Sequence, residues 1–107
     1  MSTTPHSEVL SFINLIDYQP GAIVSRQIAK GEGGNITLFA FDKDQELSEH
    51  TTPYEALVQV VDGEVNITIS GKAFLVKVGE AIILPANQPH GVKAVKRFKM
   101  ILTMIKA

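Results

Sequence analysis

Two histidines that lie far apart in the chain are the residues best suited to chemistry. His50 lies in the segment Leu-Ser-Glu-His-Thr-Thr-Pro-Tyr-Glu-Ala of residues 47–56, and His90 ends a stretch that begins at Gly79. Imidazole can bind a metal ion or transfer a proton near neutral pH. The sequence contains no cysteine, which excludes disulfides, thiol nucleophiles and cysteine-bound metals. Any metal ion would therefore need histidine, carboxylate or neutral oxygen ligands.

The residues between the two histidines predict the elements that would bring them together. Three β-patterned runs, residues 55–61, 64–69 and 72–78, are joined by Asp62-Gly63 and Ser70-Gly71. Such dipeptides are typical of two-residue β-hairpins. We therefore expect a tightly folded antiparallel meander that returns both histidines to one mouth.

The rest of the chain has the same β character. Further β-patterned runs cover residues 22–29, 35–41, 81–84 and 97–106. The glycine-rich residues 30–34 precede a β-branched and aromatic run rather than a helix, which favours a hairpin turn over a phosphate-binding loop. Residues 9–16 are compatible with a short helix or an edge strand. Eight or nine short strands predict an all-β barrel or two-sheet jelly roll, with at most one short N-terminal helix.

Length and charge limit the classes of function. The 107 residues fit one domain, and we expect a flexible tail over residues 1–7 followed by a single barrel domain over 8–107. The net charge is -1 and no strongly basic cluster occurs, which argues against a nucleic-acid partner. The N-terminus lacks the pattern of a signal peptide and no apolar run is long enough to span a membrane, so we expect a cytoplasmic protein without a membrane partner.

The stretch that ends at His90 resembles the second motif of the cupins, and the chain is similar to a small single-domain member of the RmlC-like cupin superfamily. That motif is Gly, five residues, Pro-any-Gly, two residues, His, three residues, Asn. The sequence matches it at Gly79, Pro85 and His90, with Asn87 and Ala94 in place of its second glycine and its asparagine. Asparagine tolerates the left-handed conformation of a turn glycine. The resemblance implies the cupin double-stranded β-helix, a jelly-roll barrel.

The first cupin motif is degenerate. It reads Gly, five residues, His-any-His, three or four residues, Glu, six residues, Gly. Aligned on Gly63 as its final glycine, the motif keeps His50 but has Thr52, Ala56 and Asp44 in place of its second histidine, its glutamate and its leading glycine.

The resemblance implies a divalent metal ion inside the barrel, held by the motif histidines and glutamate. Only His50 and His90 carry over as metal ligands, and Glu55 is the candidate third ligand. Simple alternation would turn Glu55 to the opposite face, unless a bulge near Pro53 shifts it. Two histidines and one carboxylate would suit iron, manganese or nickel, with zinc as a further candidate.

Two other interpretations of these residues stay open. Both histidines could be hydrogen-bonding groups at the barrel mouth without a metal ion. Thr52 and Tyr54 are candidates to line the pocket, although Tyr54 could instead pack beside Pro53.

Three functions are compatible with the sequence. The first is an enzyme with metal-dependent dioxygenase-like or isomerase-like chemistry on a small molecule. The second is a non-catalytic module that binds a small-molecule ligand without metal, and the third is a dimeric scaffold with a vestigial pocket. We also expect a homodimer, because the run 97–106 is apolar on both faces and residues 9–16 have no evident place in a single barrel.

Overall fold

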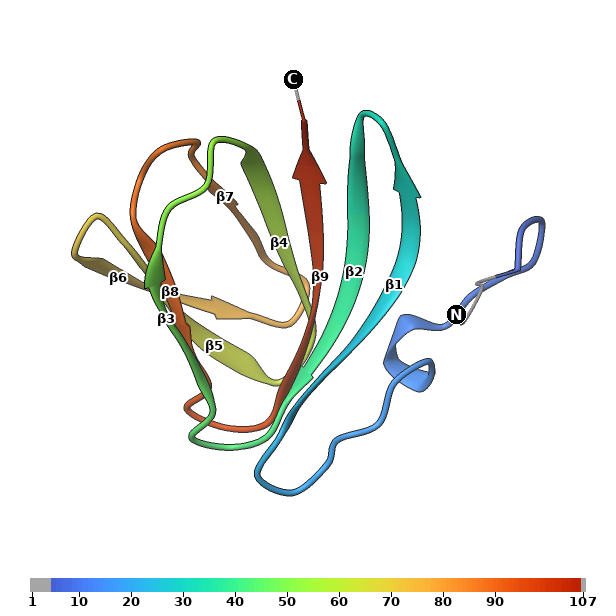
Figure 1. Ribbon diagram of the computed structural model, residues 1–107. Helices are drawn as coiled ribbons and strands as arrows, with labels where there is room; N and C mark the ends of the chain where they lie inside the picture. Colours follow the sequence, from blue (N-terminus) through green and yellow to red (C-terminus); the bar gives the residue numbers. More distant parts are fainter. Residues whose placement is uncertain (1–4, 107) are drawn as a thin grey trace.

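The computed structural model describes residues 5–106, which form two antiparallel sheets packed face to face (Figure 1). One sheet has the strand order β1-β2-β9-β4-β7 and the other the order β3-β8-β5-β6. The elements are a 3-10 turn η1 (Phe12–Asn14) and the strands β1 (Ile23–Gly31), β2 (Gly34–Phe41), β3 (Glu46–His50), β4 (Glu55–Asp62), β5 (Glu64–Ile69), β6 (Lys72–Lys77), β7 (Ala81–Leu84), β8 (His90–Lys93) and β9 (Phe98–Ile105). This confirms the predicted all-β jelly roll with one short helical turn. No helix within residues 5–106 is long and apolar enough to cross a membrane.

Six of the strands form three pairs that are nested around one turn. β5 pairs with β6 across Ser70-Gly71, β4 pairs with β7 outside them, and β3 pairs with β8 outside those. Ser70 and Gly71 have φ of 49° and 83°, the left-handed pair that a type I′ hairpin requires. The predicted hairpin at this position is therefore confirmed. The β4–β7 pair belongs to the five-stranded sheet, whereas the β5–β6 and β3–β8 pairs belong to the four-stranded sheet. The segment from β3 to β8 is therefore a long hairpin that folds over so that its strands enter both sheets.

The prediction of a second hairpin at Asp62-Gly63 was wrong. β4 and β5 do not pair with each other, because β4 lies in the five-stranded sheet and β5 in the four-stranded one. Gly63 has φ of 71°, and a Cβ on it would overlap the carbonyl oxygen of Arg97. A dipeptide that tolerates left-handed conformations serves a corner between sheets as well as a hairpin. The chain therefore crosses from one sheet to the other between β4 and β5, and does not form the simple meander that we expected.

The two strands that carry the histidines, β3 and β8, were not predicted from the sequence pattern. All residues of β3 except Leu47 are exposed, so β3 lacks the apolar alternation that marks a strand. β8 is only four residues long, follows Pro89 and includes Gly91. β3 is held as a strand by its pairing with β8, and β8 by its pairing with both β3 and β5, which no local pattern predicts.

The main core fills the space between the two sheets. The rings of Phe41 and Phe98 stack there with centroids 4.6 Å apart, and both side chains are fully buried. The other fully or nearly fully buried members come from both sheets, and include Val58, Val60, Val65, Ile67 and Met100. The core is continuous with the wall of the internal cavity, which Val58 and Met100 also line.

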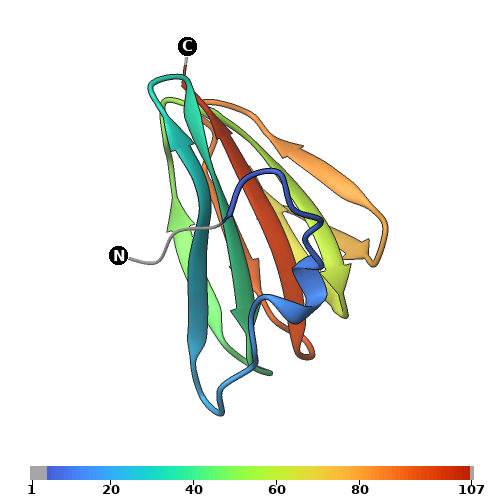
Figure 2. The same ribbon diagram turned by 90° about the vertical axis from the view of Figure 1, so that its right-hand side faces the viewer.

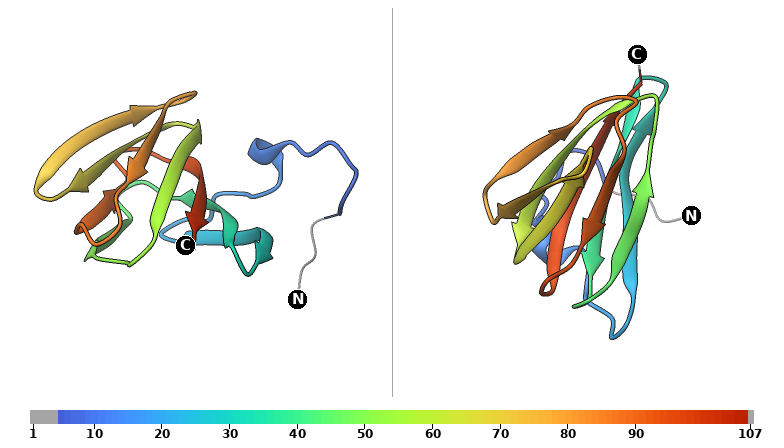
Figure 3. Two further views of the ribbon diagram at one scale, coloured as in Figure 1. Left: turned by 90° about the horizontal axis from the view of Figure 1, so that it is seen from above. Right: turned by 90° about the vertical axis from the view of Figure 1, so that its left-hand side faces the viewer.

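A second apolar cluster lies on the outer face of the five-stranded sheet. Residues 11–21, which we call the N-terminal strap, run across this face (Figure 2), and the left panel of Figure 3 shows the strap outside the two facing sheets. Ile16 of the strap is buried against Leu38 of β2 and Ile101 of β9. Phe12 and Leu15 pack at its edge. The strap therefore covers apolar residues that an isolated barrel would expose.

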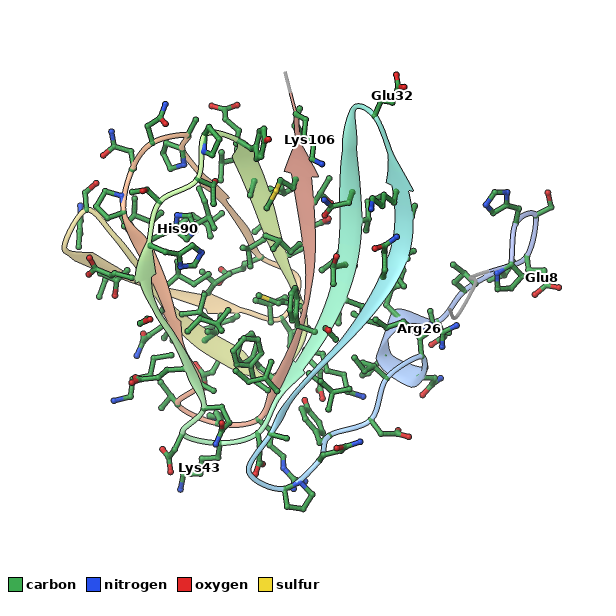
Figure 4. The ribbon with its side chains drawn as sticks, in the orientation of Figure 1. Glu8, Arg26, Glu32, Lys43, His90 and Lys106 are labelled. Atoms are coloured by element: carbon green, nitrogen blue, oxygen red, sulfur yellow. The ribbon has the colours of Figure 1, made fainter. Side chains whose placement is uncertain are left out.

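Two cationic side chains hold the strap by its backbone. Lys99 Nζ donates to the carbonyl oxygen of Ile13 at 2.6 Å, and Lys99 is 7% exposed. Arg26, labelled in Figure 4, points from β1 to the strap, where its Nη1 donates to the carbonyl oxygen of Leu15 at 3.2 Å. Ile13 belongs to η1 and Leu15 directly follows it, so both cations bind carbonyl groups that the short turn leaves without a partner of its own. The strap gives the N-terminal apolar segment a place within one chain, which removes one of the two arguments for a dimer.

Candidate functional site

His50 and His90 are direct partners across the β3–β8 pair. Their ring centroids are 4.5 Å apart and the ring planes make an angle of 66°. Two loops, residues 51–54 and 85–89, leave these strands at the same end of the barrel, and the backbone N–H of Asn87 donates to the carbonyl oxygen of Thr52 at 2.8 Å. Figure 4 labels His90 at this end. The two histidines thus lie side by side at the barrel mouth.

The backbone fixes the tautomer of both histidines. His50 Nδ1 lies 2.9 Å from the carbonyl oxygen of Ser48, and His90 Nδ1 lies 3.2 Å from that of Gln88. Because a carbonyl oxygen only accepts, each Nδ1 must carry the proton. In the neutral imidazole the lone pair is then on Nε2, and neither Nε2 makes a hydrogen bond to another residue in the described part of the chain. Both Nε2 atoms are available to a ligand.

Burial lowers the pKa of His90 below its ordinary value of 6.5, and the nearby His50 acts in the same direction against the opposing hydrogen bond to Gln88. The His90 imidazole is accordingly neutral at pH 7, with its Nε2 lone pair free. Because the unfolded chain binds this proton more readily than the folded one, the contribution of His90 to stability is complete above pH 6.5 and decreases as the pH falls below it.

The histidines open onto a small and mostly apolar cavity inside the barrel. Its volume is about 50 Å³, and both sheets contribute to it. The lining residues are Phe39, Leu47, His50, Thr52, Ala56, Val58, Leu84, His90, Val92, Met100, Leu102 and Met104. A cavity of ~10–15 Å³ is enough to hold one water molecule, and pockets for drug-sized ligands reach ~300 Å³ or more. The cavity therefore suits one ion or a group of very few atoms.

All four positions at which the cupin motifs place metal ligands line this cavity. His50, Thr52, Ala56 and His90 occur in the lining, which supports the alignment of the degenerate first motif. Here they contribute two imidazoles, one hydroxyl and one methyl group. The hydroxyl of Thr52 donates to the carbonyl oxygen of Tyr54 at 3.1 Å, which leaves only its lone pairs for a ligand. The cavity keeps the place of the family's metal centre but only half of its strong donors.

The structure does not bring Glu55 to the histidines. Glu55 is exposed and pairs with Ile105, while its neighbour Ala56 is buried and lines the cavity. The β4–β9 register is regular from Glu55 to Val60, so the bulge that would have turned Glu55 inward is absent there. Within residues 5–106, no three side chains of histidine, cysteine, aspartate or glutamate cluster as metal ligands would.

Tyr54, the other candidate for the pocket, is not among the lining residues. Its ring lies under Lys106, whose Nζ is 5.8 Å from the ring centroid. Leu47 and Val92, which do line the cavity, were missed because they face each other on β3 and β8, the two strands that the sequence pattern did not identify.

The fold and the site together define a small β-barrel whose internal cavity opens at a histidine pair. The family model of the cupin domain matches residues 37–106, and the chain belongs to the cupin family. This confirms the resemblance found in its motifs.

Solved structures extend the similarity over the whole chain. A conserved protein of unknown function from Streptococcus pyogenes is 32% identical with a TM-score of 0.91, and the alignment covers 100% of this chain and 96% of that one. A cupin 2 conserved barrel domain protein from Leptotrichia buccalis is 40% identical with a TM-score of 0.85, over 88% of this chain and 46% of that one. A cupin superfamily protein from Desulfitobacterium hafniense shares the fold at 23% identity, with a TM-score of 0.91 over 99% and 97% of the two chains. No curated protein matched the chain.

Proposed function

We propose that the protein is a binding module that holds one small guest, a metal ion or a compact ligand, at the barrel mouth through Nε2 of His50 and His90. One observation carries this proposal. Two imidazoles on adjacent strands are locked by their backbone hydrogen bonds so that both free Nε2 atoms serve one cavity of about 50 Å³. Side chains held in this way lose little freedom when a guest binds.

The donor set favours binding over metal-dependent catalysis of the dioxygenase-like or isomerase-like kind. Catalytic metal sites commonly use three protein ligands and leave positions open for water and substrate. The cavity supplies two imidazoles, and Glu55, the candidate third ligand, faces away from it. A site at the position of the cupin metal centre, with two of its four ligand positions lacking strong donors, fits a module that binds its guest without chemical turnover.

Zn²⁺ and Ni²⁺ are suitable probes of this proposal, because both accept imidazole ligands. Each ion, added in excess to protein stripped with a chelator, should raise the melting temperature by several degrees. A hundredfold excess over the dissociation constant adds ~2.7 kcal/mol to the free energy of unfolding. His50→Ala and His90→Ala should each abolish the rise, and lowering the pH to 5 should weaken it because protons compete for Nε2. Differential scanning fluorimetry measures both effects.

Glu55→Gln is the matched control for this experiment. Because Glu55 lies on the opposite face of β4 from Ala56, the variant should show the same metal-induced rise as the wild type. A rise that disappears in Glu55→Gln would mean that the carboxylate reaches the ion. No rise in the wild type with any metal ion, and none with small organic ligands, would remove the proposal.

We also propose that the protein is a homodimer, with the uncovered part of the outer face of the five-stranded sheet as its interface. The strap leaves Ile83 of β7 and Ile105 of β9 exposed at 60% and 55%. Leu57 of β4 lies between β7 and β9, paired with Ile83 on one side and with Thr103 on the other. An apolar patch of this kind is typically covered by a partner.

Light scattering at micromolar concentration should therefore give about twice the chain mass of 11.6 kDa. Ile83→Lys should shift the protein to the monomer, because it places a charge within the apolar patch. Leu75→Lys is the control, since Leu75 is 50% exposed but lies on β6 in the other sheet. A monomeric wild type, or dissociation by both variants alike, would contradict this interface.

A further inference from the structure

The heteroatoms of the cavity lining are soft. Apart from the two imidazoles and the Thr52 hydroxyl, they are the thioether sulfurs of Met100 and Met104. The sequence contains three methionines, so two of them line this one small cavity. No carboxylate and no thiol is present among the lining residues. This set of donors differs from that of the cupin metal centre in kind as well as in number.

The two methionines occupy different depths of the barrel. Met104 pairs with Ala56 on β4, and Ala56 lines the same cavity as Thr52 and His50. Met104 is half-buried, whereas Met100 is 2% exposed and packs in the core between Phe39 and Val60. Met100 is therefore a core side chain. Met104 lines the cavity from the five-stranded sheet. The histidine pair lines the same end of the cavity from the four-stranded sheet.

Ligand chemistry decides which ion this set would select. Hard cations such as Ca²⁺, Mg²⁺ and Mn²⁺ require oxygen ligands, of which the cavity has one weak example in Thr52. Zinc sites are built from cysteine, histidine and carboxylate rather than thioether. Imidazole and thioether together are favourable to copper(I).

The apolar walls add a second preference. The cost of moving an ion from water into an apolar cavity rises steeply with its charge, so a monovalent ion is less penalised than a divalent one. A volume of about 50 Å³ admits one such ion. The low charge, the small size and the preference for soft donors that the cavity requires are all properties of copper(I).

We propose that His50, His90 and Met104 form a binding site for one copper(I) ion, with both imidazole Nε2 atoms and the Met104 sulfur as its ligands. This inference rests on the proposed role of the histidine pair as the guest-binding groups. It specifies the guest and adds a third ligand that the cupin motifs do not contain.

The test is a titration of metal-free protein with copper(I), supplied anaerobically as its acetonitrile complex, in competition with a chromogenic copper(I) chelator. We expect one copper(I) ion per chain. Met104→Leu keeps the side-chain volume and should lower the copper(I) affinity at least ~10-fold, as even the loss of an outer-shell partner lowers metal affinity by about that factor. Thr103→Ser, next to Met104 on β9 but outside the cavity lining, is the control and should leave the affinity within about twofold of the wild type.

A parallel Zn²⁺ titration separates failure of this inference from failure of the proposed function. Met104→Leu should leave the Zn²⁺ affinity unchanged, while His50→Ala should remove the binding of both ions. X-ray absorption at the copper edge should show a sulfur neighbour in the wild type and none in Met104→Leu. Copper(I) binding that is insensitive to Met104→Leu, or Zn²⁺ binding without copper(I) binding, would overturn the copper site alone. If neither ion depends on the histidines, both proposals fail.

Discussion

Gly63→Ala should lower the free energy of unfolding by more than ~3 kcal/mol. Gly63 has φ of 71°, a conformation that costs a residue with a Cβ ~1–2 kcal/mol. The added methyl group would also overlap the carbonyl oxygen of Arg97, so the backbone at the corner between the sheets must move. Urea denaturation followed by circular dichroism measures the change.

Gly71→Ala separates the two causes. Gly71 has φ of 83°, but a Cβ on it would meet no atom within 4 Å. This variant should therefore lose only the ~1–2 kcal/mol of backbone strain. Equal losses in Gly63→Ala and Gly71→Ala would show that the close approach to Arg97 has no effect on stability.

Ile16→Ala should lower the free energy of unfolding by ~2–4 kcal/mol, because it empties a buried position under the N-terminal strap. Ile16 is 5% exposed and packs on Leu38 and Ile101, outside the main core. The strap contributes this stability only if it stays on the sheet in solution. The same denaturation experiment measures it.

Ile13→Ala is the control for the strap. The Ile13 side chain is 43% exposed, and the hydrogen bond from Lys99 goes to its backbone carbonyl group, which the substitution keeps. We expect a loss of ~0.5 kcal/mol or less. A loss in Ile16→Ala as small as that in Ile13→Ala would mean that the strap is not held against the sheet.

The parts of the fold that the sequence predicted are those set by local pattern. Alternation and β-branched residues identified the strands that line the main core, because one face of each is buried. The turn at Ser70-Gly71 followed from its need for two left-handed residues. Asn87, placed at a glycine position of the cupin motif, does have a left-handed φ of 64°.

What the sequence did not predict depends on tertiary pairing. β3 and β8 have no apolar alternation of their own, and Asp62-Gly63 is compatible with a hairpin and with a corner between sheets. Residues 9–16 are too few for periodicity to decide their structure, and only the outer face of the sheet shows where they pack. For the site, the position of both histidines followed from the motif, but the facing of Glu55 required the actual register of β4.

The nesting of the strand pairs also has a consequence for the order in which the barrel closes. The β5–β6 hairpin joins residues close in sequence, whereas the β3–β8 pair spans the longest loop of the three and pays the largest closure entropy. β3 is short and largely exposed, which makes this outermost pair the first to fray. A guest bound by His50 and His90 would link β3 to β8 and hold the two strands together. Its arrival and departure would then be coupled to the fraying of one strand pair, with the rest of the barrel remaining folded.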